Sequence, residues 1–362
     1  MNKSLLTCLL LLLSIAVQAQ SEDRWVAFRD STSTLIGFKD ANGKVKIAPR
    51  FSEGTRANYF EHIIAVVEEK EGRDENYYLT KTGKKAGRDS LHIFDFEADC
   101  ESEGFIRFRD KASGQVGMFD KNGKVVIPAL YNHLSKVHNG LVWALKGATE
   151  RYLDKHKEHS VWEGGEELLL NLKHEIVLRN FKYGRNVNLY SFEASAKPAK
   201  DPNRQSFKSE KGEFYSFIDF DREFKNWLNS NLLNSFTFDN MAKASHDSIT
   251  FWLESNGWIT EAKASFLIRN LDLIREKMLV VKKNKADYNV FIDELNPYMF
   301  NGRSFEKYYN NCGEAIIEKY PVMHLVINTK AGSDVVQNRF EFLRTENGYK
   351  LISLVIRNGE IK

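Results

Sequence analysis

The stretch Gly117–Tyr131, GMFDKNGKVVIPALY, has the pattern of a β-hairpin and decides how the rest of the chain is interpreted. Asn122-Gly123 can adopt the positive φ angles that a tight turn, or a turn with a bulge, requires. Three β-branched residues at 125–127 favour a strand, and Pro128 ends it. The question is whether this hairpin stands alone or is one copy of a repeated unit.

The same pattern occurs 80 residues earlier in the chain. Residues 25–51, WVAFRDSTSTLIGFKDANGKVKIAPRF, align without a gap on residues 105–131, FIRFRDKASGQVGMFDKNGKVVIPALY. An ungapped match of this length indicates an internal repeat. Its turn residues are Asp40 and Gly43 in the first copy, and Asp120 and Gly123 in the second.

Halving the offset to 40 residues reveals weaker copies. The sequence from Tyr78 to Lys84 keeps a turn glycine, Gly83, but has Thr80 in place of the aspartate. A further partial copy begins at Tyr152-Leu-Asp154, where Lys157 occupies the glycine position. Degenerate terminal copies are usual in repeat proteins, because an end unit faces water where an inner unit faces a neighbour.

The pattern Gly-aromatic/Met-x-Asp-x-x-Gly-Lys-x-x-Ile, followed by an aromatic residue, resembles the bacterial WG-repeat family, also called KWG repeats. The resemblance covers residues 25–162, although the name-giving Trp-Gly pair is Ile36-Gly37 and Val116-Gly117 here. It implies short antiparallel strands and hairpins stacked side by side. It also implies a binding or scaffolding role, because the family is not tied to one enzymatic activity.

Each full copy also contains an Arg-Asp pair, Arg29-Asp30 and Arg109-Asp110. The pairs could form a rim that binds a ligand. The alternative is a turn at the end of a strand with an exposed ion pair, which would contribute little to stability. We favour the turn.

The first nineteen residues are typical of a signal peptide. Lys3 supplies a positive charge, Leu5–Val17 is apolar, and Val17-Gln18-Ala19 offers small residues at a cleavage site. An apolar run of about 13 residues is shorter than the roughly 20 that a transmembrane helix needs. We therefore expect cleavage near Ala19 and export to the periplasm or the cell exterior as a soluble protein.

Composition sets broad limits on the mature protein. A chain of 362 residues, 42% hydrophobic and 28% charged, is typical of about two folded domains. A formal net charge of +3 gives no support for nucleic-acid binding. We expect a protein or envelope-component partner, and the sequence leaves the oligomeric state open. Two cysteines remain after cleavage, Cys100 and Cys312; because they fall in separate predicted domains, we expect unpaired thiols.

The predicted fold is mixed: an N-terminal all-β array of stacked antiparallel hairpins at 20–194, a linker at 195–204, and an α+β domain at 205–362. Helical spacing is present at Phe220, Phe224, Trp227 and Leu228, and again at Ile249, Trp252 and Leu253. Thr260 is placed to cap the next helix, and a further helix is expected over Ser304–Lys319.

The end of the chain changes to period two. Met323–Asn328, Val335–Leu343 and Tyr349–Ile356 predict three strands of an antiparallel meander, joined by turns at 331–333 and 346–348. The last hairpin resembles that of NTF2-like domains, in which a curved sheet and helices enclose a pocket. That resemblance implies a small-ligand pocket but identifies no site residue.

Few residues suggest chemistry. His246-Asp247-Ser248 has the residue types of a catalytic triad, but neighbours on a helix point in different directions. Asp219 and Asp221 could bind a metal, although Asp221 is better explained as a cap or first-turn charge. Asp293-Glu294 lacks a histidine at ligand spacing, Cys312 with His324 has the residue types of a thiol–imidazole pair without further support, and His156 with His159 lacks a third ligand.

We predict no catalytic, cofactor-binding or metal-binding residues and no cofactor. Trp143, Trp252 and Trp258 are possible binding aromatics, and Phe251 could join the last two in stacking on a sugar, although such residues more often belong to a core. The sequence therefore favours an exported, non-enzymatic binding or scaffold module of the cell envelope. The alternative is an envelope enzyme or small-ligand-binding protein with its site in an NTF2-like pocket.

Overall fold

The computed structural model describes residues 24–362 except 157, 183, 185, 283–286 and 332–333, so the predicted signal peptide lies outside the described residues. The chain divides into two compact units. The first, which we call the array, runs to Lys182 and includes the distant segment Tyr309–Glu314. The second, the α+β unit, comprises Tyr183–Tyr308 and Ala315–Lys362.

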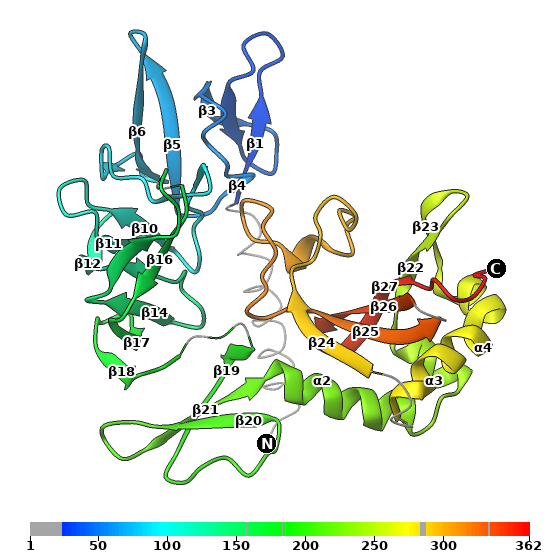
Figure 1. The fold of residues 1–362 in the computed structure, drawn as a ribbon. Helices are drawn as coiled ribbons and strands as arrows, with labels where there is room; N and C mark the ends of the chain where they lie inside the picture. The colour runs from blue at the N-terminus through cyan, green and yellow to red at the C-terminus, as the bar shows by residue number, and fades with distance from the viewer. Residues whose placement is uncertain (1–23, 157, 183, 185, 283–286, 332–333) are drawn as a thin grey trace, which may run out of the picture. The chain divides into compact units, whose positions relative to one another are not determined.

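The array is built of short antiparallel strands (Figure 1). Its first sheet has the order β4-β1-β2-β3-β5-β6-β7, with β1 Trp25–Arg29, β2 Ile36–Lys39, β3 Val45–Phe51, β4 Tyr59–Phe60, β5 Ile63–Lys70, β6 Arg73–Thr80 and β7 Lys85–Ala86. A second sheet contains β10 Phe105–Arg109, β11 Val116–Asp120 and β12 Val125–Tyr131, and a third contains β13 His133–Leu134, β14 Leu141–Lys146, β17 Glu166–Asn171 and β18 Ile176–Arg179. Small hairpins are formed by β8 Ile93–Phe94 with β9 Glu97–Ala98, and by β15 Thr149–Tyr152 with β16 Ser160–Glu163.

The two full sequence copies fold alike, as the offset of 80 residues predicts. Gly37 pairs with Phe28 and Gly117 with Phe108, and a bulge follows in both copies. A side chain at Gly37 would lie 2.6 Å from the carbonyl oxygen of Ile47 and 2.8 Å from the nitrogen of Pro49. The repeat therefore requires glycine here because the next strand approaches too closely for any side chain.

The α+β unit begins with a three-stranded sheet in the order β19-β21-β20, formed by β19 Val187–Ser195, β20 Arg204–Lys208 and β21 Phe214–Asp219. The segment predicted as a linker, 195–204, connects two strands of this sheet. The division between the units falls earlier, between Lys182 and Tyr183, and the array recovers 309–314 from later in the chain.

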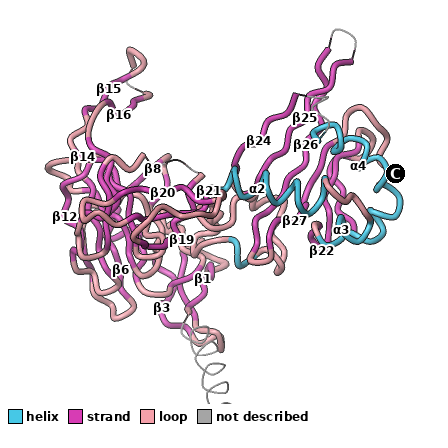
Figure 2. The backbone as a smooth tube through the Cα atoms, turned by 90° about the horizontal axis from the view of Figure 1, so that it is seen from below, coloured by secondary structure: helices cyan, strands magenta, loops and turns pink. Residues whose placement is uncertain are grey.

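A six-stranded sheet with helices on one face forms the rest of the unit (Figures 1 and 2). Its order is β23-β22-β27-β26-β25-β24, with β22 Ser245–Leu253, β23 Gly257–Ala262, β24 Asp287–Asp293, β25 Val322–Ala331, β26 Asp334–Thr345 and β27 Gly348–Val355. The helices are α2 Phe220–Leu228, a π-helical turn at Asn229–Leu233, α3 Phe238–Lys243 and α4 Lys263–Lys282. None of the helices in the described part of the chain has the length and apolar character needed to cross a bilayer.

The predicted fold class is confirmed, including the closing meander of β25, β26 and β27 and the helix at 220–228. The turn at 346–348 is present; the one at 331–333 lies partly outside the described residues. Asp219 caps α2 by accepting a hydrogen bond from the backbone N–H of Arg222 at 3.0 Å, and Asp221 lies in the first turn.

Three helix predictions were wrong. Ile249, Phe251 and Leu253 alternate on one face of β22 and contact the core, so the spacing read as helical belongs to a strand. Thr260 lies inside β23, and the helix begins later, at Lys263. Over 304–319 the structure has one 3₁₀ turn, Glu306–Tyr308, followed by a tight turn at 310–314 that interrupts any helix.

Candidate functional site

The aspartates and glycines of the repeat build its turns. The Asp120 carboxylate accepts hydrogen bonds from the backbone N–H groups of Asn122 and Lys124, both at 2.9 Å. Asp40 makes the same two contacts in the first copy, at 3.0 Å. The glycines Gly43, Gly83 and Gly123 all have positive φ, between 66° and 85°. These residues therefore shape the turns.

Two weaker turns of the array have the same geometry. Asp154 accepts from the N–H groups two and four residues later, although Lys157 itself lies outside the described residues. Asn171 does so as well, with His174 at a φ of 62° in the glycine position. The second of these turns was missed from sequence because neither its first residue nor its fourth matches the repeat.

A turn of this type also occurs at 310–314, far beyond the repeats. The Asn310 side chain accepts from the N–H groups of Cys312 at 2.9 Å and Glu314 at 3.1 Å, and Gly313 has a φ of 82°. The Asn310 N–H in turn donates to the Glu314 carbonyl at 2.8 Å. We call Asn310–Glu314 the docked turn, because it belongs to the array although the chain on both sides of it belongs to the α+β unit.

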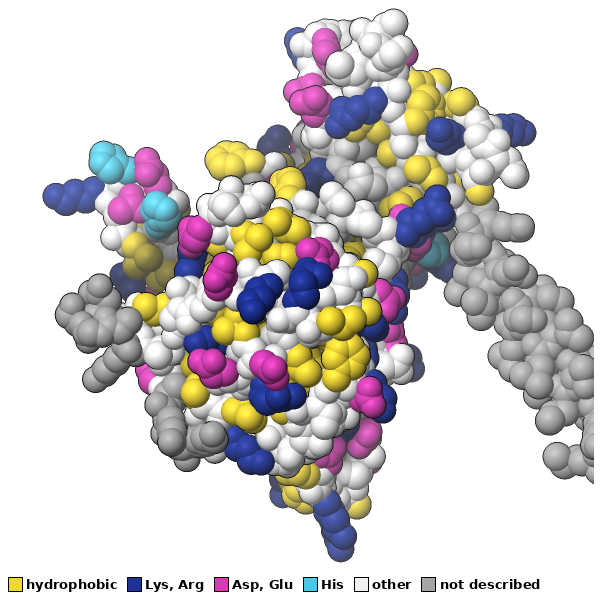
Figure 3. Space-filling view, turned by 90° about the vertical axis from the view of Figure 1, so that its right-hand side faces the viewer, with side chains coloured by type: hydrophobic (Ala, Val, Ile, Leu, Met, Phe, Trp, Pro, Cys, Tyr) yellow, Lys and Arg dark blue, Asp and Glu magenta, His cyan; other side chains and the backbone are white. Residues whose placement is uncertain are grey.

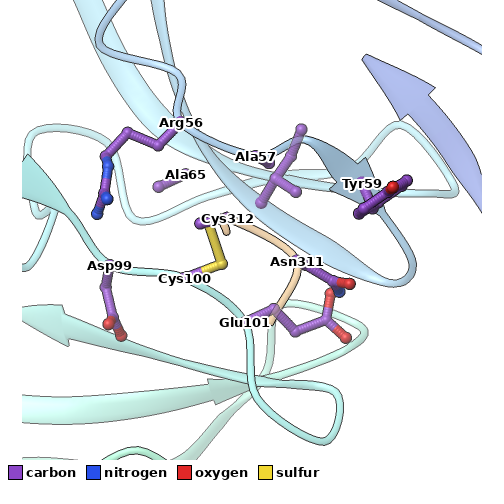
Figure 4. A pocket seen from close by; sticks show the side chains of 10 residues that line it. Arg56, Ala57, Tyr59, Ala65, Asp99, Cys100, Glu101, Asn311 and Cys312 are labelled. Atoms are coloured by element: carbon purple, nitrogen blue, oxygen red, sulfur yellow. A yellow bond between two sulfur atoms is a disulfide. The ribbon is translucent and has the colours of Figure 1, made fainter. Parts of the chain in front are cut away.

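A disulfide joins Cys100 of the array to Cys312 of the docked turn (Figure 4). The expectation of two unpaired thiols was wrong, and with it the pairing of a Cys312 thiol with His324. It assigned the two cysteines to separate domains from their positions in the chain, whereas the segment containing Cys312 folds with the array.

Three equivalent positions of the array meet at the docked turn. In each of three successive units a side-chain oxygen accepts a hydrogen bond from a backbone N–H of the following strand; the pairs are Thr55 with Val67, Asp99 with Arg107, and Ser135 with Trp143, at 3.0, 3.0 and 2.9 Å. The residues that come directly after these acceptors are Arg56, Cys100 and Lys136, and all three contact the docked turn.

The docked turn is recognised through one carboxylate and one carbonyl. Arg56 donates to Glu314 at 2.8 Å, and Lys136 makes a second ion pair with the same carboxylate. These cations outweigh the cost of burial and hold the pKa of Glu314 below its usual value. The carbonyl oxygen of Asn311 accepts from two consecutive backbone N–H groups, at 58 and 59, at 2.8 and 3.1 Å.

A buried ion pair supports this region from below. Asp99 binds Arg107 in a two-pronged contact, with Oδ1 to Nη2 at 2.6 Å and Oδ2 to Nε at 3.0 Å. Burial alone would raise the pKa of Asp99, but the charge and hydrogen bonds of Arg107 hold it well below its ordinary value. Asp99 is therefore a buried anion whose charge is balanced mainly by Arg107.

Glu101 connects neighbouring repeat units. One of its carboxylate oxygens accepts from the backbone N–H groups of His62 and Ile63 at 3.0 and 3.1 Å, and the other contacts the His62 ring at 2.5 Å. The hydrogen bond to Glu101 raises the pKa of His62. With Glu61 these residues form a group whose ligand atoms lie within 4.8 Å of one another. They are suitable in type for a divalent cation, but both oxygens of Glu101 already have partners within the array.

Two hollows lie in the array near the docked turn. The one beside the disulfide, shown in Figure 4, has about 10 Å³, which is room for about one water molecule. A more open cleft of about 320 Å³ is lined by polar and apolar side chains, including Phe28, Arg29, Ile36, Glu53 and Arg56. We call this the array cleft; it is the larger of the two and includes one of the residues that hold the docked turn.

The repeated Arg-Asp pairs form turns, and Arg29 also reaches the array cleft. Asp30 and Asp110 accept hydrogen bonds within their own turns, from Ser33 and Ser113. Arg29 lies 3.7 Å from Glu53. The ion pair expected within each Arg-Asp pair is thus replaced, for Arg29, by a contact with Glu53 across the cleft.

The three tryptophans singled out from the sequence are separate in kind. Trp143 is half-buried in the array and donates its indole N–H to Glu167 at 3.2 Å. Trp252 and Trp258 face each other across β22 and β23, with ring centroids 5.5 Å apart, and Trp258 is 41% exposed. Phe251 points to the opposite face and is buried in the core.

The remaining candidates do not assemble into a catalytic constellation. His246, Asp247 and Ser248 are consecutive in a strand rather than a helix, and Asp247 forms its ion pair with Lys263. His156 and His159 are exposed, and His159 lies 3.3 Å from Asp154.

Charges are mixed on the surface. On the face shown in Figure 3, acidic and basic side chains alternate among polar and hydrophobic ones. The small net charge is therefore not gathered into a basic area on this face.

The docked turn left a signal in the sequence. Arg56 and Lys136 are 80 residues apart, like the repeat itself, and Asn310-Asn-Cys-Gly313-Glu has the spacing of the repeated turn. Their convergence could not be inferred, because it depends on a segment that returns to the array from far along the chain.

Comparisons with known proteins agree with the repeat. Neither the curated proteins nor the solved structures gave a match. A family model described as "WG containing repeat" matches residues 117–148, which begin at the glycine of the best-preserved copy. This match supports the interpretation of the chain as a WG repeat protein.

Proposed function

We propose that the protein is an exported, non-enzymatic binding or scaffold module of the cell envelope, and that the array is its binding part. The observation that carries the proposal is the docked turn. Three equivalent positions of successive repeats hold a turn from outside the repeats, by a disulfide, two ion pairs and two backbone hydrogen bonds. Recognition spread over several units is how repeat proteins bind.

Two features support export. The N-terminal sequence has the three parts of a signal peptide. A disulfide between residues 212 positions apart is of the kind that persists in oxidising compartments and is rare in the cytosol.

The alternative function, an enzyme or ligand site in the C-terminal unit, requires reactive groups in a cavity. A cleft of about 480 Å³ is present there, lined by Leu233, Asn234, Phe236, Arg275, Leu279 and Lys282. Its two cations donate to the backbone carbonyls of Phe236 and Leu233. This lining offers neither a nucleophile nor a carboxylate, which favours the non-enzymatic function.

The array cleft is the expected partner site, and capture from a solubilised envelope fraction tests it. Immobilised mature protein should retain a protein that the Arg29→Ala/Glu53→Ala variant retains at least about tenfold less, because the variant removes the charges across the cleft. The matched control is Arg151→Ala/Glu163→Ala, which removes another exposed ion pair, on the β15–β16 hairpin, and should capture normally. Capture of nothing above blank resin, or equal capture by all three proteins, would contradict the proposal.

A further inference from the structure

Polar side chains form a row across the face of the six-stranded sheet that is turned away from the helices. Register places Thr250 of β22 beside Ser353 of β27, Ser353 beside Glu341 of β26, and Glu341 beside His324 of β25. We call these four residues the polar row. Their sequence neighbours Phe251, Leu354, Phe340 and Leu325 lie in the core with the helices. The row thus belongs to the opposite face, where side chains of alternate residues point.

The polar row contains buried groups without hydrogen-bond partners. Ser353 is fully buried, and the described residues offer its hydroxyl no partner. His324 is 7% exposed; its Nδ1 lies 3.8 Å from Glu341 and its Nε2 3.7 Å from Asp293, both beyond hydrogen-bond reach. The indole N–H of Trp252, two residues along β22 from Thr250, is also buried and unpartnered. Native proteins satisfy nearly all buried polar groups, so three on one face indicate a missing partner.

The row is reachable from its borders. The side chains of Arg339 and Asp293, which contact Glu341 and His324, are 41% and 52% exposed. Trp258 and Thr260 are exposed at the β23 end. A partly exposed rim around a buried floor is the arrangement of a recessed binding site.

The chemistry of the row selects the class of ligand. Hydroxyl, carboxylate, imidazole and indole groups together supply both donors and acceptors, which suits a molecule with many hydroxyl groups. Aromatic side chains stand at both ends, the Trp252–Trp258 pair at one and Phe291, stacked on His324 at 4.8 Å, at the other. Glu341 and Asp293 disfavour an anion. Four strands span about 14 Å, enough for two sugar rings.

We propose that the polar row binds a neutral saccharide on the helix-free face of the sheet, with Ser353 and the Trp252 indole as hydrogen-bond donors. The site does not rest on the function proposed for the array. It lies on the face opposite the pocket that an NTF2-like domain would form.

Calorimetric titration of the mature protein with maltose and with N,N′-diacetylchitobiose tests the site. We expect one of them to bind, and Ser353→Ala and Trp252→Phe each to weaken binding at least about tenfold, because each removes one buried donor. Trp143→Phe, which removes an indole N–H in the array, is the matched control and should bind normally. Absence of heat with both sugars at millimolar concentration overturns the proposal, as does unchanged affinity in the two variants.

A second readout separates ligand binding from a structural role. Ser353→Ala should raise the midpoint of thermal unfolding of the unbound protein, because it removes a buried hydroxyl that lacks a partner. A lower midpoint would mean that the hydroxyl already has a partner, such as a fixed water molecule, and would contradict a vacant donor kept for a ligand.

Discussion

Replacing Cys312 with serine is expected to destabilise the array by about 5 kcal/mol. The disulfide closes a loop of 212 residues, and in the chain-entropy description a crosslink of this length reduces the entropy of the unfolded chain by about that amount. The loss should be large also because the docked turn keeps its ion pairs only while it stays in place. Urea denaturation, followed by hydrogen exchange of array peptides, measures it.

Reduction provides the control. Wild-type protein in dithiothreitol should fall to the stability of the Cys100→Ser/Cys312→Ser variant, and that variant should not respond to dithiothreitol. If the variant and the oxidised wild type unfold at the same urea concentration, the disulfide does not hold the docked turn in the array.

Asp99→Asn is expected to cost about 3–5 kcal/mol, the range found when one partner of a buried ion pair is removed. The change keeps the size of the side chain but leaves the Arg107 guanidinium buried with its balancing charge removed. Asp95→Asn is the matched control: Asp95 is exposed, and surface substitutions of this kind usually change stability by less than about 0.5 kcal/mol. Equal stability of the two variants would contradict the role of the buried pair.

The pH dependence of this effect has a definite sign. The folded-state pKa of Asp99 is depressed, so its contribution is fully present above the pKa of about 3.9 that it has when unfolded. It is lost as the pH falls through the folded pKa. The difference in unfolding free energy between wild type and Asp99→Asn should therefore be constant from pH 5 to 7 and shrink in stronger acid. A constant difference down to pH 2 would show that the charge is not its source.

The parts of the fold that local patterns determine could be predicted from the sequence. The turn Asp120-Lys-Asn-Gly123 needs one carboxylate and one residue with positive φ, and both are visible in the letters. The final meander follows from period-two alternation. The error at β22 arose because Ile249, Trp252 and Leu253 fit a helical period by coincidence, while Ile249, Phe251 and Leu253 fit the strand that forms.

The sites depend on contacts between distant segments and were largely invisible. Cys100 meets Cys312 only because six residues of a later segment fold with the array. Ser353, Glu341 and His324 become neighbours through the register of three strands, and each alone reads as an ordinary strand residue. The offset of 80 between Arg56 and Lys136 was the available hint, and it acquires meaning only when Glu314 lies between them.

Peptide mapping of the protein purified from its own cells without reducing agent tests most directly whether this is an exported protein whose array holds the docked turn. The account predicts an N-terminus at or near Gln20 and a peptide containing Cys100 linked to one containing Cys312. An intact leader beginning at Met1, or two cysteines that both react with a thiol reagent, would contradict it.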